Sequence, residues 1–109
     1  MKTVRLLAAC LTLLTLSYET LPAKEKEVKS SIRPTGKVKK ENLPTLAKIS
    51  MAEALKAAMA AAPGSVLKAE LEIEDGNLMY SFDIVTDQKT VLEVEVDAGN
   101  GKVLDVDKD

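Results

Sequence analysis

The stretch that decides the fold is residues 66–107, VLKAELEIEDGNLMYSFDIVTDQKTVLEVEVDAGNGKVLDVD. Apolar and charged residues alternate through four short runs of this stretch, and turn residues separate the runs. A period of two is typical of a β-strand with one buried face and one solvated face. The sequence therefore predicts the four strands of an antiparallel sheet.

One face of these strands is apolar and the other is mainly acidic. The apolar face comprises Leu67, Ala69, Leu71, Ile73, Leu78, Tyr80, Phe82, Ile84, Leu92, Val94, Val96, Leu104 and Val106. The charged face comprises Lys68, Glu70, Glu72, Glu74, Asp83, Glu93, Glu95, Asp97, Asp105 and Asp107. We expect the first face to form the core and the second to be exposed to solvent.

The first hairpin has a strong turn signal in Asp75-Gly76, which favours a two-residue loop. The expected cross-strand pairs are Ile73–Leu78, Leu71–Tyr80, Ala69–Phe82, Leu67–Ile84 and Lys68–Asp83. The last of these pairs opposite charges, which is favourable. The next connection, around Asp87-Gln88-Lys89, is compatible with two registers, and the sequence does not distinguish them.

The last hairpin is expected to turn through Gly99-Asn100-Gly101. The expected pairs are Val96–Leu104, Val94–Val106, Glu95–Asp105 and Glu93–Asp107. Like charges that lie directly opposite one another destabilise a sheet. These opposed acids are the feature of the sequence that points most directly to a function.

A helix is predicted before the strands. Ser50-Met51-Ala52-Glu53 is a capping box, the following run is rich in alanine, and Pro63-Gly64 ends it. The stripe expected to pack on the sheet comprises Ala52, Leu55, Met59 and Ala62. The predicted fold class is therefore α+β, with one N-terminal helix packed on a four-strand antiparallel meander sheet.

The N-terminus has the features of a secretory signal peptide. Lys2 and Arg5 precede an apolar run at 6–16, and LPA at 21–23 supplies a cleavage site after Ala23. The run is too short to span a bilayer, so no stable membrane span is expected after removal of residues 1–23. Alternatively, LAAC at 7–10 is a lipoprotein box that would acylate Cys10. Either interpretation predicts export, with a periplasmic or secreted location.

Charge is segregated along the chain. Residues 24–46 hold seven Lys and Arg against three Glu, a net +4, whereas residues 48–109 hold six Lys against thirteen Asp and Glu, a net −7. Residues 24–48 contain few apolar side chains and are expected to form a basic flexible linker before the domain at 49–109. This linker could lie on anionic lipid, on a partner or on the acidic domain. Nucleic acid is not expected, because no aromatic residue neighbours Lys37, Lys39 or Lys40.

The residue types argue against an enzyme. The chain has no His, and its only Cys is Cys10, so a Ser–His or Cys–His nucleophile cannot be assembled. Paired carboxylates on an open sheet face lack the closed pocket that catalysis needs. No cofactor and no metal site are expected, since residues 97–102 do not follow the EF-hand pattern. Weak cation binding across Glu93, Glu95, Asp105 and Asp107 is the alternative, and it would make the protein a Ca²⁺-responsive structural protein.

Several segments of residues 49–109 resemble the PepSY domain. They are ISMAEAL at 49–55, APG at 62–64, the strand at 67–73, Tyr80, VDA at 96–98 and GKVL at 101–104. Gly99-Asn100 departs mildly from the family pattern, in which an ordinary residue and Thr are common. The resemblance implies an exported α+β module found in propeptides of thermolysin-like metalloproteases and in small stand-alone proteins. It implies a role in binding and restraining proteases, without catalytic residues.

The expected function is that of a small binding module of the cell envelope. It would restrain a protease or dock a basic protein through the acidic face or an edge strand, and a dimer could form at such an edge. The expected partner-binding residues are Glu70, Glu72, Glu93, Glu95, Asp105 and Asp107.

Overall fold

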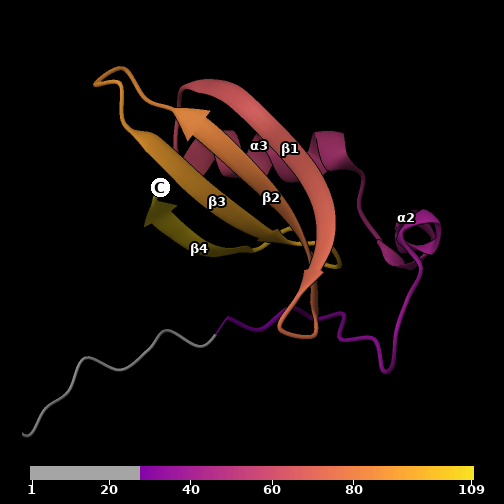
Figure 1. The fold of residues 1–109 in the computed structure, drawn as a ribbon. Coiled ribbons are helices and arrows are strands. Elements are labelled where there is room, and N and C mark those ends of the chain that lie inside the picture. Colours follow the sequence, from indigo (N-terminus) through magenta and orange to yellow (C-terminus); the bar gives the residue numbers. More distant parts are fainter. Residues whose placement is uncertain (1–27) are drawn as a thin grey trace, which may run out of the picture.

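A computed structural model describes residues 28–109. The predicted signal peptide, Cys10 and the linker residues 24–27 lie outside this range. The elements are η1 (Lys40–Asn42), α2 (Leu43–Leu46), α3 (Met51–Ala61), β1 (Ser65–Glu74), β2 (Asn77–Val85), β3 (Val91–Asp97) and β4 (Val103–Lys108). The predicted fold class is confirmed: α3 lies against one face of an antiparallel sheet of order β1-β2-β3-β4 (Figure 1).

Helix α3 begins at the predicted capping box. The Ser50 hydroxyl accepts a hydrogen bond from the Glu53 N–H at 3.1 Å, and the Glu53 carboxylate accepts one from the Ser50 N–H at 3.3 Å. The packing face agrees only in part with the predicted stripe, of which Ala62 is buried in the core. Its fully buried members are the small residues Ala54 and Ala58, whereas Ala52 is exposed. Leu55 and Met59 are half-buried and flank the contact. The alanines face the sheet because their small side chains let the helix backbone approach it closely.

This close approach predicts a large difference between two alanines of α3. Ala58 is completely buried and Ala60 is exposed. Ala58→Leu should lower the free energy of unfolding by about 1–3 kcal/mol, because the added carbons overpack the contact between helix and sheet. Ala60→Leu should change it by less than about 0.5 kcal/mol. Urea unfolding of both variants measures the difference, and equal effects would show that α3 does not pack tightly.

The first hairpin has the predicted register over most of its length. Asp75 and Gly76 have φ angles of 50° and 81°, as a type I′ turn requires, and four of the five expected pairs form. The pair Leu67–Ile84 is wrong. A bulge between Val66 and Lys68 places Val66 opposite Ile84. This extra residue leaves the Leu67 side chain 64% exposed.

The other two connections settle the remaining registers. A short loop with Lys89 at φ 64° joins β2 to β3, and it pairs Val85 with Val91. In the last hairpin, Val94–Val106, Glu95–Asp105 and Glu93–Asp107 form as predicted. The pair Val96–Leu104 is wrong, because a bulge after Glu95 sets Val96 opposite Val103. The turn is also longer than predicted, since the Asp97 N–H donates to the Lys102 carbonyl at 2.8 Å.

The core lies between α3 and the two central strands. Its buried strand residues are Leu78, Tyr80, Phe82, Ile84, Val94 and Val96. The segment before α3 also contributes, which differs from the flexible linker expected over residues 28–48. Leu43 of α2 belongs to the core and is only 7% exposed. Val38, Leu46 and Ala47 pack against the core from outside. The few apolar residues of this segment are thus used as anchors on the domain.

Candidate functional site

The candidate site is the face of the sheet opposite α3, called the outer face below. Strand alternation and the pairing register bring residues of all four strands together on it. One row across the sheet contains Lys68, Asp83, Glu93 and Asp107, and the next contains Glu70, Ser81, Glu95 and Asp105. The predicted opposition of acids is therefore present, and the structure adds a third case, Asp83 opposite Glu93.

All six predicted partner-binding residues lie on the outer face, but they are not equally accessible. Asp107 is exposed, and Glu70, Glu72 and Glu93 are partly exposed. Glu95 and Asp105 are buried, with relative exposures of 7% and 9%. Met79, Ser81 and Asp97 of this face are buried as well. The expectation of a fully solvated face is thus wrong for its centre and holds for its margin.

Glu95 has the most perturbed carboxyl group of the outer face. Its burial, a hydrogen bond with Glu74 and the nearby charges of Glu74, Glu93 and Asp105 raise its pKa from 4.5 to about 8. A protonated Glu95 can donate a hydrogen bond to the Glu74 carboxylate, and this arrangement favours the neutral form. At neutral pH the face therefore carries less negative charge than its sequence implies.

Two further glutamates of the outer face also have raised pKa values. Burial is the main cause for the pKa of Glu72, followed by the charge of Glu70. Burial is likewise the main cause for the pKa of Glu93, and the neighbouring Asp83 adds to it. These shifts have the sign expected where carboxylates crowd together, because each charge disfavours the next.

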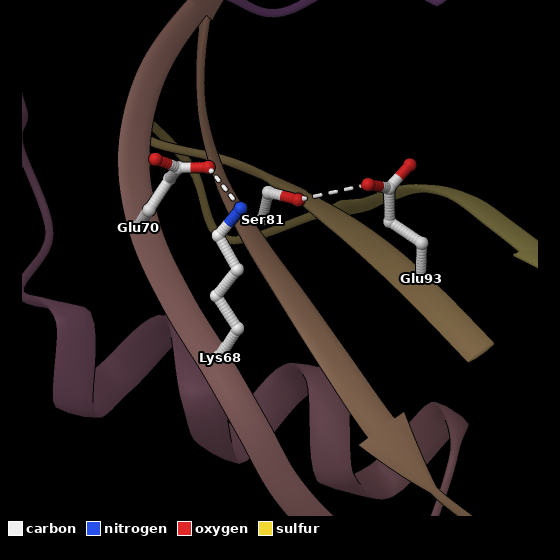
Figure 2. Close-up of polar contacts among 4 residues, drawn as sticks. All are labelled: Lys68, Glu70, Ser81 and Glu93. Atoms are coloured by element: carbon white, nitrogen blue, oxygen red, sulfur yellow. Dashed lines mark hydrogen bonds and ion pairs between the residues drawn. The ribbon is translucent and has the colours of Figure 1, made fainter. Parts of the chain in front are cut away.

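The positive charge on this face is held close to β1. The Lys68 ammonium contacts the Glu70 carboxylate at 3.2 Å, and this hydrogen bond raises the pKa of Lys68 (Figure 2). The predicted pairing of Lys68 with Asp83 exists in the register, but the Lys68 ammonium forms its ion pair with Glu70. Ser81 donates a 3.5 Å hydrogen bond to Glu93. Lys68 therefore neutralises one edge of the face and leaves the row toward β4 acidic.

Sequence reasoning missed a second polar cluster, at the end of the sheet. The Asp97 carboxylate accepts hydrogen bonds from the Gly99 and Asn100 N–H groups of the last turn at 2.7 and 3.3 Å. It also accepts from Ser31, which lies 66 positions earlier in the chain. Two adjacent serines in a polar segment before the domain are typical of a solvated chain, so they did not indicate this contact.

Neither a metal cluster nor a membrane-spanning helix occurs in the described part of the chain. Within residues 28–109, no three acidic side chains, including those of the cation-binding alternative, form a group that could hold a metal ion. No helix there is long and apolar enough to cross a bilayer.

Comparison with known proteins gives one match. The family model described as "Peptidase propeptide and YPEB domain" (PepSY) matches residues 48–107. This range includes α3 and all four strands except the last residue of β4. No curated protein and no solved structure matches the chain significantly.

Proposed function

Because the chain belongs to the PepSY family, whose domains are propeptide-like or inhibitory modules, we propose that it binds a protein partner rather than catalysing a reaction. The partner is a basic protein of the cell envelope, foremost a protease, and it docks on the outer face. This proposal includes the export predicted from residues 1–23.

The observation that carries the proposal is the row of Asp83, Glu93 and Asp107. Three acids follow one another directly across β2, β3 and β4. Each like-charged pair opposes folding by a few tenths of a kcal/mol to about 1 kcal/mol, and a purely structural sheet would gain by alternating signs. Lys or Arg side chains of a partner would remove this repulsion on binding, and complementary charge speeds association and sets specificity.

The edge of β1 adjoins this face and offers main-chain groups to the same partner. β1 is ten residues long, it pairs only with β2 in the sheet, and residues 65–69 are exposed. An extended segment of a partner could add to such an edge through main-chain hydrogen bonds. Glu70 and Glu72 of β1 would then meet the side chains of that segment.

Charge reversal on the accessible part of the row tests the proposal. Glu93→Lys with Asp107→Lys should reduce capture of basic envelope proteins at least tenfold, because each replaced carboxylate becomes a repulsive charge. Capture by the immobilised protein from envelope extract at 50 and 300 mM NaCl, with quantitative mass spectrometry, measures this. The protease activity of the captured fraction should fall when the wild-type protein is added in excess.

The control carries the same change of charge elsewhere. Glu41 and Asp87 are exposed and lie in η1 and in the β2–β3 loop. Glu41→Lys with Asp87→Lys should leave capture within twofold of wild type. Thermal unfolding of both double variants establishes that they are folded. If the Glu93 and Asp107 variant retains its captured proteins as well as this control does, the outer face is not the docking surface.

A further inference from the structure

Residues 28–32, called the strap below, lie against the end of the sheet, beside the β1–β2 hairpin (Figure 1). The strap bends at Ser31, where the Ile32 N–H donates a hydrogen bond to the Ser30 hydroxyl at 3.1 Å. The Asn77 side chain brackets the strap backbone. Its Oδ1 accepts from the Ser30 N–H at 2.8 Å, and its Nδ2 donates to the Val28 carbonyl at 2.9 Å. The Leu78 N–H donates to the Ile32 carbonyl at 3.0 Å. These three bonds fix the register of the strap through its main chain.

Asp97 and Leu78 bind the two serine side chains of the strap. Asp97 accepts from the Ser31 N–H at 2.7 Å and from the Ser31 hydroxyl at 2.8 Å. The Ser30 hydroxyl lies 2.7 Å from the Leu78 carbonyl and 3.2 Å from Asp97 Oδ1, so its single proton has two acceptors. Ser30, Asn77 and Asp97 are buried, with exposures of 6%, 2% and 2%. Buried hydroxyls need such partners, which makes the site selective for serine here.

The groups that receive the strap are held in place by the sheet itself. Asp97 is fixed by the Gly99 and Asn100 N–H groups, and Asn77 Nδ2 also donates to the Asp75 carbonyl at 3.2 Å. Gly99 leaves the space that the Ser31 hydroxyl fills, because a Cβ on residue 99 would collide with it. A receptor that is already ordered binds a peptide segment with less loss of entropy.

We propose that Asn77, Leu78, Asp97 and Gly99 form a binding site for a Ser-Ser-aliphatic peptide, which the chain fills with its own Ser30-Ser31-Ile32. The strap is therefore a ligand attached to its receptor. The connection that follows it, residues 33–42, is mostly exposed, and it packs against the core through Val38 before the chain is buried at Leu43. A tethered ligand acts at an effective concentration in the millimolar range for short flexible links, so it blocks the site against a free peptide.

Release of the strap tests this site in the full chain. Ser30→Ala with Ser31→Pro removes both hydroxyls and the Ser31 N–H donor without altering the receptor. This release variant should bind a fluorescent peptide of residues 28–33 (VKSSIR, with blocked ends) at least tenfold more tightly than wild type, measured by fluorescence anisotropy. A peptide with the same two replacements should not bind. Equal affinity of wild type and release variant for VKSSIR would overturn the proposal.

Receptor variants in the release background identify the site. Asp97→Asn should weaken peptide binding at least tenfold, whereas Asp107→Asn, a matched change on the outer face, should leave it within twofold. Equal binding by these two variants would overturn the proposal. If Asp97→Asn does not fold, Gly99→Ala replaces it, because its Cβ occupies the position of the Ser31 hydroxyl. Gly99→Ala should also weaken binding at least tenfold, and unchanged binding would equally overturn the proposal.

Discussion

Replacing Glu95 with glutamine is expected to stabilise the protein at pH 8 and to remove most of the stability that the wild type gains on acidification. The pKa of Glu95 is about 8 in the folded protein, against an ordinary value of 4.5, because of burial and then the hydrogen bond with Glu74. A raised carboxyl pKa means that the folded state binds the proton more tightly than the unfolded state. This contribution is fully present below about pH 4.5 and is lost as the pH rises through 8.

The expected size is about 1–2 kcal/mol between pH 5 and pH 8, since solvent screening reduces the full effect of such a shift. Glutamine is neutral at every pH and can still donate a hydrogen bond to Glu74. Urea unfolding at pH 5, 6.5 and 8, followed by circular dichroism, should show a falling stability for wild type and a flatter one for Glu95→Gln. Glu41→Gln, an exposed change in η1, is the control. Parallel pH profiles of wild type and Glu95→Gln would contradict the prediction.

The strand pattern was predictable because alternation and turn chemistry are local. Asp75-Gly76 marks its own hairpin, and a period of two assigns each side chain to a face. The two wrong pairs lie where a bulge inserts one residue. No residue type at Val66-Leu67-Lys68 marks the first bulge. The bulge changes the pairing only of the residues before Lys68, so the rest of β1 keeps the predicted register. The acid pairs of the last hairpin form as predicted, because the bulge in that hairpin lies between Glu95 and Val96, outside these pairs.

The burial of the outer face was not predictable from alternation. Alternation places Glu95 on the outer face, but it does not say what covers that face. The register aligns Glu95 with Ser81 and Glu70, whereas its hydrogen-bond partner is Glu74, on the diagonal. Such diagonal contacts follow from the twist of the sheet and from the length of the glutamate side chains. Neither is visible in a one-dimensional pattern.

The strap was missed for a different reason. Its contacts join residues 46 to 67 positions apart, and two serines in a polar segment are typical of a solvated chain. The one useful signal is Gly99. A glycine usually marks a positive φ, which here occurs at Gly101 in the same turn. Gly99 instead provides room for Ser31, and such close approach becomes evident only once the two segments are placed together.

Replacing Asp97 with alanine is expected to lower the free energy of unfolding by about 2–4 kcal/mol at pH 7. Burial alone would raise the pKa of Asp97, but hydrogen bonds from the Gly99 N–H, Ser31 and the Asn100 N–H outweigh it and hold this pKa below 3.8. Alanine would remove these hydrogen bonds to a charged acceptor, and such a bond typically contributes about 1.5–3 kcal/mol. Asp107→Ala, on the exposed margin of the outer face, should change stability by less than about 0.5 kcal/mol.

The pH dependence of this variant separates Asp97 from Glu95, its neighbour two residues earlier on β3. A lowered pKa means that Asp97 contributes stability above about pH 4 and loses it as the pH falls through its folded value. The wild type should therefore be most stable near pH 5, where Asp97 is charged and Glu95 is neutral. Asp97→Ala should no longer lose stability as the pH falls below 5, but it should still lose stability as the pH rises toward 8. Glu95→Gln should show the opposite behaviour. Urea unfolding from pH 3 to pH 8 measures both arms, and an Asp97→Ala variant as stable as Asp107→Ala would show that the strap and turn do not depend on this carboxylate.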